Sequence, residues 1–390
     1  MKISVITGSR SEFGLLQWVI KGIQEENQLE LSLLVTGMHL SPEFGATYKN
    51  IEDTGFKIDK KIEILMSSDT SIGISKSTGL GIISISEALE QIKPDLVMVL
   101  GDRFEIFSAC IAATFLKIPI AHIHGGERTE GSIDESIRHS ITKLSHFHFA
   151  STEEYKKRII QLGENPKNVF CTGTPGIDSI YNYKLLNKSQ IESKLNFKLG
   201  NLSATVTYHP DTLEKDINPK NINNLLSALN EFEDLKVIFC LPNADTYGRT
   251  LSSIVKKYFV DNPNKGITSI NLGQKVYLSA IKNTNLVIGN SSSGIIEAPS
   301  FKKPTVNVGE RQKGRLSGDT VIHVNNSKKS IIAGIEKALS KEFLSKIKKS
   351  INPYGDKGAS KRIVDTIKQI KLNDNTIKKE FFDMKNLINH

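Results

Sequence analysis

The chain has 390 residues, of which 38% are hydrophobic and 24% charged, a composition typical of a globular protein long enough for two domains. No apolar run approaches the roughly 18 residues that a membrane span needs, and the first residues form a strand pattern rather than a secretory signal. Three widely separated cysteines suggest neither a disulfide framework nor a CxxC metal site. We therefore expect a cytoplasmic protein with no membrane partner.

The formal net charge of +9 raises the question of a nucleic-acid partner. Most of the excess lies in residues 328–385, which contain 15 Lys and Arg against 7 Asp and Glu. These residues are spread along helical patterns, without interleaved aromatic residues and without a recognised nucleic-acid-binding motif. They are more typical of solvated helix faces, so we expect no nucleic acid as partner.

Through residue 178, short apolar runs alternate with amphipathic helical patterns. A polar, glycine-rich patch at 73–81 is predicted to precede one of these helices, at 84–91. The other predicted elements are strands 3–7, 29–36, 95–100, 118–123 and 146–150, and helices 15–23, 104–117, 132–145 and 152–162. This alternation is typical of a doubly wound parallel sheet.

Residues 179–200 are rich in Asn, Lys and Ser, with no clear strand, and are predicted to be a linker. A second alternating set follows, with strands 204–208, 236–240, 266–270, 285–289, 304–307 and 321–324, and helices 219–231, 246–259, 274–282 and 294–299. The predicted fold is α/β, with two doubly wound Rossmann-like domains, 1–178 and 201–365, that face across a cleft (GT-B-like). The last segment, 366–390, is predicted to be helical and able to pack back on the first domain.

Two predicted strands of the first domain end in glycine beside ionisable residues. Strand 95–100 runs into Gly101-Asp102-Arg103, and strand 118–123 runs into His124-Gly125-Gly126-Glu127. Because ligands bind beyond the carboxyl ends of parallel strands, we expect Asp102, His124 and Glu127 to converge in an active site.

The loop that follows adds Asp134, Glu135 and His139, and groups of differing pKa suit acid–base chemistry. Asp134 and Glu135 are equally typical of the acids in the first turn of a helix. His122 and His124 share one face of a strand by the period of two. A zinc site needs further ligands at recognisable spacing, so we expect no metal.

The sharpest anion-binding pattern lies in the second domain. An apolar strand runs into Gly289-Asn290-Ser291-Ser292-Ser293-Gly294, where small residues let a diphosphate approach the N-terminus of a helix. Glu297 follows one helical turn later, in position to accept hydrogen bonds from a sugar diol. A plain serine N-cap with a first-turn glutamate has a similar sequence.

Three further positions are candidates for anion or leaving-group contacts. Gly8-Ser9-Arg10 lies at a strand-to-helix turn, but it is not GxGxxG and no acidic residue ends the next strand, so a dinucleotide cofactor is disfavoured. His209 ends a strand of the second domain. Arg311, Lys313 and Arg315 either neutralise a pyrophosphate or simply decorate a loop.

Seven segments together resemble the hydrolysing UDP-N-acetylglucosamine 2-epimerases, from residue 1 to about residue 365. They begin at residues 8, 35, 101, 122, 136, 289 and 309 and read GSRSEFG, VTGMH, GDRFE, HIHGGE, SIRHSITK, GNSSSG and GERQKGR. The resemblance implies elimination of UDP from UDP-GlcNAc to a 2-acetamidoglycal, then addition of water to give N-acetylmannosamine and UDP. It also implies a sialic acid or legionaminic acid pathway, no cofactor, and a homo-oligomer (dimer or tetramer).

The resemblance further implies roles for individual residues. Asp102 and Asp134 match catalytic acids of the family, and His209 matches the histidine that assists UDP departure. The residues expected to contact the UDP-sugar are Arg10, Arg103, Arg138, His139, Asn243, Ser291, Ser292, Ser293, Gly294, Glu297, Arg311 and Arg315. His124 stands where many members carry a catalytic Glu, so that proton task is expected to pass to His124, Glu127 or another group, an imidazole being suited to neutral pH.

The HIHGGE form makes the substrate uncertain between UDP-GlcNAc, the first expectation, and UDP-N,N'-diacetylbacillosamine. A GT-B glycosyltransferase shares the predicted fold and nucleotide site but transfers to an acceptor. A basic nucleic-acid-binding protein is the alternative of another class.

Overall fold

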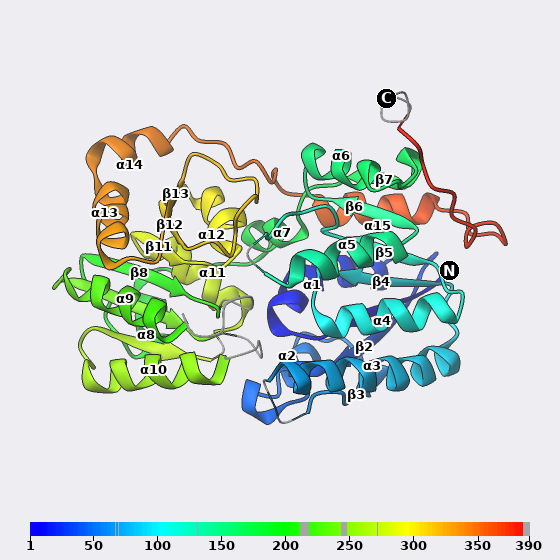
Figure 1. Cartoon of the computed structure of the whole chain (residues 1–390), viewed down its shortest axis with the longest axis horizontal. Coiled ribbons are helices and arrows are strands. Elements are labelled where there is room, and N and C mark those ends of the chain that lie inside the picture. The colour runs from blue at the N-terminus through cyan, green and yellow to red at the C-terminus, as the bar shows by residue number, and fades with distance from the viewer. Residues whose placement is uncertain are drawn as a thin grey trace. The chain divides into compact units, whose positions relative to one another are not determined.

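A computed structural model describes residues 1–384 except 67, 69, 131, 211–217, 243–247 and 271 (Figure 1). The chain divides into two compact units. Unit 1 comprises Met1–Glu127, Asp134–Asp178 and the chain from Tyr354 onward, and unit 2 comprises Arg128–Ile133 and Ser179–Pro353.

Unit 1 contains a parallel sheet of seven strands in the order β3-β2-β1-β4-β5-β6-β7. Its elements are β1 (Lys2–Thr7), α1 (Arg10–Gln24), β2 (Glu30–Thr36), η1 (Gly37–His39), η2 (Pro42–Phe44), α2 (Tyr48–Asp53), β3 (Lys60–Ile62), α3 (Ser71–Ile92), β4 (Leu96–Leu100), α4 (Phe104–Phe115), β5 (Ile120–Ile123), α5 (Asp134–Leu144), β6 (Phe147–Ala150), α6 (Glu153–Gln161), η3 (Pro166–Asn168), β7 (Val169–Cys171) and α15 (Ala359–Gln369); α7 (Pro175–Asn182) contains the boundary between the units.

Helices cover both faces of this sheet, which is why its central strands β4 and β5 are buried at every position. All five residues of β4 and all four of β5 are buried. One face packs against α1, α2 and α15, and the other against α3, α4 and α5. The carboxyl ends of β4 and β5 are therefore held rigidly, and the residues that follow them emerge from a fixed frame.

Helix α3 differs from the sequence expectation. It begins at Ser71 and runs through the glycine-rich patch that was predicted to precede a shorter helix at 84–91. Gly81 explains the glycines in part, because a Cβ there would lie 2.8 Å from the Ser108 Oγ of α4. Close approach of α3 to α4 outweighs the low helix propensity of glycine. Gly79, by contrast, has open space where its Cβ would stand.

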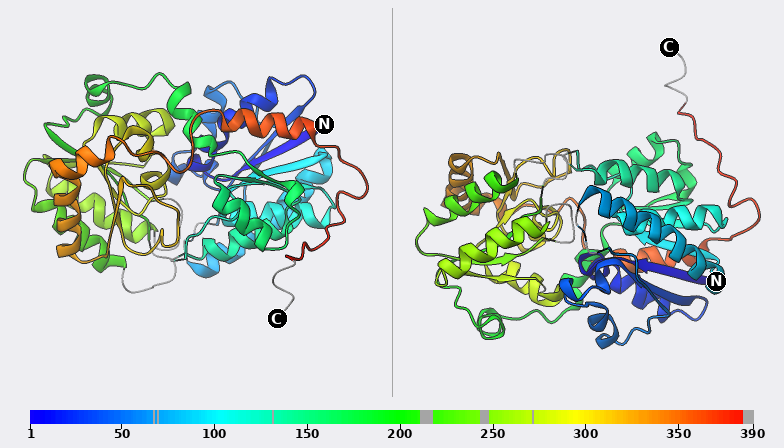
Figure 2. Two further views of the ribbon diagram at one scale, coloured as in Figure 1. Left: turned by 90° about the horizontal axis from the view of Figure 1, so that it is seen from above. Right: turned by 60° about the horizontal axis from the view of Figure 1, so that its bottom comes forward.

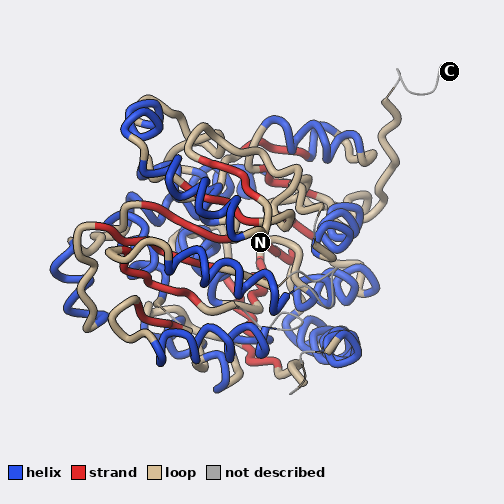
Figure 3. Tube along the Cα trace, turned by 60° about the vertical axis from the view of Figure 1, so that its left-hand side comes forward, coloured by secondary structure: helices blue, strands red, loops and turns tan. Residues whose placement is uncertain are grey.

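Unit 2 contains a parallel sheet of six strands in the order β10-β9-β8-β11-β12-β13. Its elements are α8 (Lys188–Leu195), β8 (Leu202–Thr207), α9 (Asn218–Asn230), β9 (Leu235–Cys240), α10 (Gly248–Asp261), β10 (Gly266–Ser269), α11 (Gly273–Asn283), β11 (Leu286–Gly289), α12 (Ser293–Ile296), η4 (Ala298–Phe301), β12 (Thr305–Val308), β13 (Val321–Val324), α13 (Lys328–Leu339) and α14 (Lys341–Ile347). Helices α9, α10 and α13 pack on one face, and α8 and α11 on the other, with strands and helices alternating as in Figure 3.

The C-terminal part of the chain returns to unit 1 at Tyr354, earlier than the residue 366 expected from the sequence. Helix α15 lies beside α1, where Figure 2 shows it in red-orange, and Val364 packs against Gly22. The buried carboxylate of Asp178 accepts hydrogen bonds from the backbone N–H groups of Gly358 and Ser360. This side chain from another helix satisfies donors that α15 itself leaves unpaired at its start.

Candidate active site

Asp102 lies just beyond β4, after Gly101, which has a left-handed φ of +83°. Its carboxylate pairs with Arg138 of α5, a guanidinium only 3% exposed. Arg138 also donates to the backbone carbonyl of Glu127 (3.1 Å) and lies 3.6 Å from the Glu135 carboxylate. One buried arginine thus joins the ends of β4 and β5 to the first turn of α5, and it holds Asp102 in place.

His122 and His124 do not share a strand face in the structure. His122 lies in β5, and its Nε2 donates to the Gly101 carbonyl (2.8 Å), which can only accept. Burial lowers the pKa of His122 to about 3, so this ring is neutral and braces the Gly101 turn. His124 lies one residue beyond β5, with a φ of +67° that is uncommon for a residue other than glycine.

With this backbone conformation, the His124 ring lies beside the Glu127 carboxylate. Its Nδ1 lies 3.7 Å from the Glu127 Oε1, which also accepts a hydrogen bond from the Ser151 hydroxyl (2.7 Å). Backbone strain of this kind costs of order 1–3 kcal/mol and clusters at functional sites. Asp102, His124 and Glu127, the three groups expected to converge, therefore belong to one cluster at the carboxyl ends of β4 and β5.

Asp134 and Glu135 open α5, so they are first-turn helix acids as well as site candidates. The Glu135 carboxylate lies 3.1 Å from the His139 Nε2, one turn along the same helix. Glu135 thus ties His139 to Arg138, and the three side chains form a continuous polar strip on α5.

A second group of buried charges lies beneath the Gly8 turn, and the sequence analysis missed it. Glu105 is fully buried and accepts two hydrogen bonds from Arg103, both 3.2 Å long. Gly8 and Gly37 lie against the Glu105 side chain, where a Cβ on either would come within 2.9 Å. Burial and the neighbouring Glu105 raise the pKa of Glu12 well above its usual value. Glu105 belongs to the GDRFE motif, but its place against Gly8, Gly37 and Arg103 is visible only in the packing.

In unit 2 the serine segment follows β11 as predicted, but its geometry differs from the expected helix terminus. Helix α12 is four residues long, and Ser292 makes no side-chain capping bond. So short a helix has little dipole, which corrects the helix-dipole argument. The segment presents hydroxyls instead: the Oγ atoms of Ser291 and Ser293 lie 3.1 Å apart, and the Tyr277 hydroxyl bonds to Ser293. Gly289 has a φ of +128°, and a Cβ there would lie 1.9 Å from the Thr207 carbonyl oxygen.

His209 is fixed by Asn290, which the sequence analysis did not assign a role. The Asn290 side chain accepts from the His209 backbone N–H (2.7 Å) and donates to the His209 carbonyl (2.9 Å). The Asn290 backbone carbonyl in turn accepts from Gln312 Nε2 (2.9 Å) and Arg311 (3.5 Å). Asn290 therefore joins three loops, which follow β8, β11 and β12, through its side-chain amide and its backbone carbonyl.

The remaining expected contacts are partly placed by the structure. Glu297 follows α12 and is 6% exposed, and Arg315 is 9% exposed in the middle of the loop between β12 and β13. Gly294 lies against Thr305, where a Cβ would come 2.7 Å from the Thr305 Cγ2. Asn243 falls outside the described residues.

Comparison with known proteins identifies the family. The sequence profile of the family described as UDP-N-acetylglucosamine 2-epimerase matches residues 21–368. The chain belongs to this family. It is 42% identical, over 98% of its length and 99% of the relative, to the GDP/UDP-N,N'-diacetylbacillosamine 2-epimerase (hydrolyzing) of Campylobacter jejuni. It is 40% identical to the polysialic acid biosynthesis protein P7 of Escherichia coli, over 98% of this chain and 97% of that protein.

A solved UDP-GlcNAc 2-epimerase from Neisseria meningitidis, bound to UDP-GlcNAc, has the same fold, with a TM-score of 0.81 and 23% identity over 95% of this chain and all of that one. The family, the enzyme class and the GT-B-like α/β fold predicted from the sequence are therefore confirmed. Among the described residues of this family member, no helix is long and apolar enough to cross a membrane.

Proposed function

We propose that this protein is a hydrolysing 2-epimerase of a UDP-linked 2-acetamido sugar with the gluco configuration. The carrying observation is the cluster in unit 1, where Arg138 holds Asp102 beside the loop that bears His124 and Glu127. The reaction needs two proton transfers at one carbon, and this cluster offers several groups that exchange protons.

The proposed chemistry balances without a cofactor. Elimination removes the proton from C2 of the sugar and breaks the C1–O bond to UDP, which leaves a 2-acetamidoglycal. Addition then joins the oxygen of water to C1 and returns a proton to C2 on the opposite face. We assign Asp102 to one of these transfers, with Asp134 as the second acid that the family resemblance implies. His124 and Glu127 form the pair that replaces the glutamate of other members.

Unit 2 is proposed to bind the leaving group. Hydroxyls of Ser291, Ser292 and Ser293 and the charge of Arg311 suit the oxygens of a diphosphate. His209, held by Asn290, is proposed to stabilise or protonate UDP as the C1–O bond breaks. Stabilisation of the departing charge is what the reaction requires of this unit.

The substrate is proposed to be UDP-GlcNAc or UDP-N,N'-diacetylbacillosamine, which differ at C4 and C6 but share the 2-acetamido group on which the chemistry depends. The family description favours the first, and the relative from Campylobacter jejuni favours the second. Measuring UDP release from the two compounds side by side decides between them.

The test of the reaction class is incubation of the purified protein with each UDP-sugar alone. We expect UDP and the free 2-epimerised sugar, with deuterium from D2O incorporated at C2. Release of UDP only when a sugar acceptor is added would instead indicate a glycosyltransferase. A His209→Ala variant is expected to lose turnover by orders of magnitude while keeping the melting temperature of the wild type.

A homo-oligomer is proposed on the basis of the outer face of α3. Ile72, Leu80 and Ile83 are 69%, 41% and 61% exposed on this helix, and exposed apolar side chains gathered along one helix are typical of an interaction surface. A second copy of the chain is the proposed partner. Light scattering of the wild type and of an Ile72→Lys, Ile83→Lys double variant tests this, with a monomeric variant as the expected result.

Location and pathway are proposed from the relatives. We propose a cytoplasmic enzyme of sialic or legionaminic acid synthesis, in keeping with the relative named for polysialic acid biosynthesis. No nucleic-acid partner is proposed, and salt-sensitive retention on DNA would contradict this.

A further inference from the structure

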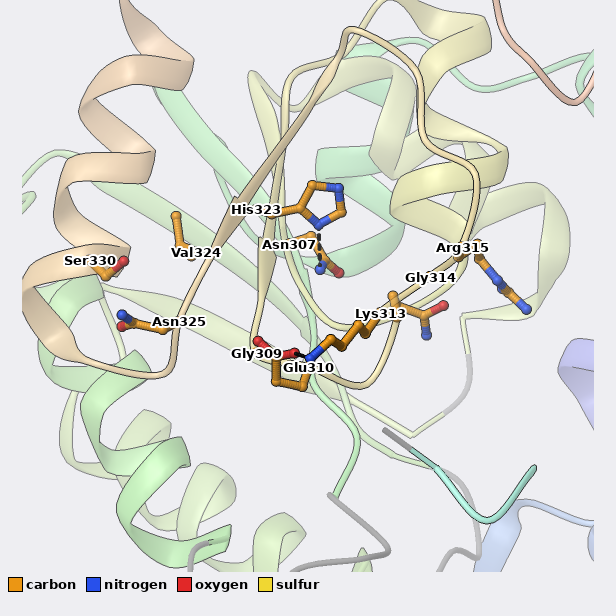
Figure 4. Close-up of a pocket in the computed structure, with 11 residues that line it drawn as sticks. Asn307, Gly309, Glu310, Lys313, Gly314, Arg315, His323, Val324, Asn325 and Ser330 are labelled. Atoms are coloured by element: carbon orange, nitrogen blue, oxygen red, sulfur yellow. Dashed lines mark hydrogen bonds and ion pairs between the residues drawn. The ribbon is translucent and has the colours of Figure 1, made fainter. Parts of the chain in front are cut away.

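Unit 2 contains a pocket of about 500 Å³ beside β12, β13 and the start of α13 (Figure 4). Its volume lies within the range of small-molecule sites. The lining residues are almost all polar: Asn307, Gly309, Glu310, Gln312, Lys313, Gly314, Arg315, His323, Val324, Asn325 and Ser330. Of these, only Lys313 and Arg315 were candidates for contact with the UDP-sugar in the sequence analysis.

Two amides in this lining are buried with an unpartnered atom. Gln312 is 1% exposed, and its Nε2 donates to the Asn290 carbonyl, which leaves its Oε1 without a hydrogen-bond partner. A carbonyl can only accept, so this bond fixes which way the Gln312 amide points. An unsatisfied buried polar atom costs about 1–3 kcal/mol and calls for an explanation.

Asn307 is 2% exposed, and its amide nitrogen lies 3.1 Å from the His323 Nδ1. The other ring nitrogen of His323 lies 3.0 Å from the Ser317 hydroxyl, so the ring has a partner on both sides. The Asn307 Oδ1 has none. Rotating the amide by half a turn would only exchange the two atoms, so one polar atom of Asn307 is unpartnered in either orientation.

The lining chemistry excludes most ligand classes. The lining contains no Phe, Tyr or Trp on which a nucleobase would stack, and its one imidazole, His323, is held edge-on by partners at both ring nitrogens. Val324 is the only aliphatic side chain of the lining, so the pocket does not suit a lipid. No group of three or more His, Cys, Asp or Glu among the described residues is arranged to hold a metal ion. An unprotonated anion such as sulfate has no donor for the Gln312 oxygen.

We propose that this pocket binds a free monosaccharide, whose ring hydroxyls both donate and accept. Hydroxyl protons would satisfy Gln312 and Glu310, and hydroxyl oxygens would accept from Lys313, Asn325 or Ser330. Glu310 and Lys313 lie 3.0 Å apart at the pocket, so the ligand meets these two charges as a pair, and the third charged side chain of the lining, Arg315, is 9% exposed. A neutral, hydroxyl-rich ring fits this surface.

Gln312 also connects the pocket to the proposed leaving-group site. Its amide nitrogen bonds to Asn290, and Asn290 holds His209 by two hydrogen bonds. A sugar bound to the Gln312 oxygen would therefore bear on Asn290, whose backbone carbonyl bonds to Gln312 and whose side chain fixes His209. This link rests on the proposed function, whereas occupancy of the pocket does not.

The test is saturation-transfer NMR of N-acetylmannosamine with the full-length protein, with the proposed nucleotide site filled by excess UDP. We expect a signal with the wild type and with Asp102→Asn, which changes only the proposed active site. Asn307→Leu removes the amide at similar volume, and Ser330→Tyr fills the pocket from its rim. Each variant is expected to weaken binding of the sugar roughly tenfold. In Asn307→Leu the cause is the loss of one hydrogen bond to a buried group, and in Ser330→Tyr it is the ring that occupies the pocket. Asn307→Asp, which keeps an acceptor, is the matched control and should retain most of the affinity.

Three outcomes would overturn the proposal. No signal with N-acetylmannosamine or N-acetylglucosamine would leave the amides to water alone. A signal that survives in both Asn307→Leu and Ser330→Tyr but disappears in Asp102→Asn would place the sugar in the active site. Tight binding of inorganic phosphate, competing with the sugar, would identify an anion site.

The connection to His209 is tested by titrating UDP with and without the sugar. We expect a severalfold shift in UDP affinity in the wild type that is absent in Gln312→Leu, and no shift in the wild type would contradict the connection.

Discussion

Replacing Arg138 by Met tests whether this arginine organises unit 1. Met keeps much of the length and the apolar stem of Arg138 but removes the cation that Asp102 and Glu135 share. Breaking a buried pair in this way costs about 3–5 kcal/mol. The Asp102 and Glu135 side chains are 20% and 23% exposed, so water partly replaces the arginine, and we expect the lower end, about 3 kcal/mol.

Thermal unfolding followed by circular dichroism measures this loss. For a unit of roughly 200 residues, about 3 kcal/mol corresponds to a fall in melting temperature of about 6–12 °C. Lys361→Met is the matched control, because the Lys361–Asp365 pair lies on an exposed helix face and contributes at most about 0.5 kcal/mol. Adding Asp102→Asn should reduce the cost of Arg138→Met. A melting temperature of Arg138→Met equal to that of the control would refute the organising role.

Three further predictions follow from the buried groups of unit 1. Asp102→Asn is expected to lower kcat roughly 10²–10⁴-fold, and near-normal kcat would remove Asp102 from the chemistry. Its fall in melting temperature should be smaller than that of Arg138→Met, because Arg138 keeps the Glu135 carboxylate and the Glu127 carbonyl. Gly8→Ala is expected to destabilise by about 1–3 kcal/mol in urea titration, because the new Cβ would lie 2.9 Å from the Glu105 Cβ; an unchanged urea midpoint would contradict this. Burial lowers the pKa of His39 and His122 to about 3, so below pH 6.5 the unfolded chain binds two protons that the folded chain does not. The free energy of unfolding should therefore fall by about 4 kcal/mol from pH 7 to pH 5. A free energy of unfolding that does not change over this range would contradict the neutral rings.

The sequence predicted the strand ends of both sheets because buried parallel strands read as continuous apolar runs. Asp102, His124 and Glu127 could be placed together for the same reason: residues that follow neighbouring parallel strands emerge at one edge of the sheet. Contacts between residues far apart in the sequence could not be predicted in this way. Nothing in the local pattern indicates that Arg138 reaches Asp102, or that Asn290 holds His209, since each bond joins residues many positions apart.

Backbone detail was the other part that the pattern could not predict. The period of two placed His122 and His124 on one strand face, but β5 ends at Ile123 and the positive φ of His124 turns its side chain elsewhere. In α3 the glycines suggested a break, although packing against α4 requires small residues there. Both errors arise because tertiary contacts override local propensity.

The two environments of glycine have a practical consequence for engineering this enzyme. A side chain at Gly289 would collide with the Thr207 carbonyl oxygen, so substitutions at this position are expected to destabilise the fold, and a mutant library should leave it unchanged. Gly79 faces open space within a helix, so Gly79→Ala should raise stability by about 0.5–1 kcal/mol by restricting the unfolded chain. Thermostabilising efforts therefore begin in α3, away from the loop after β11.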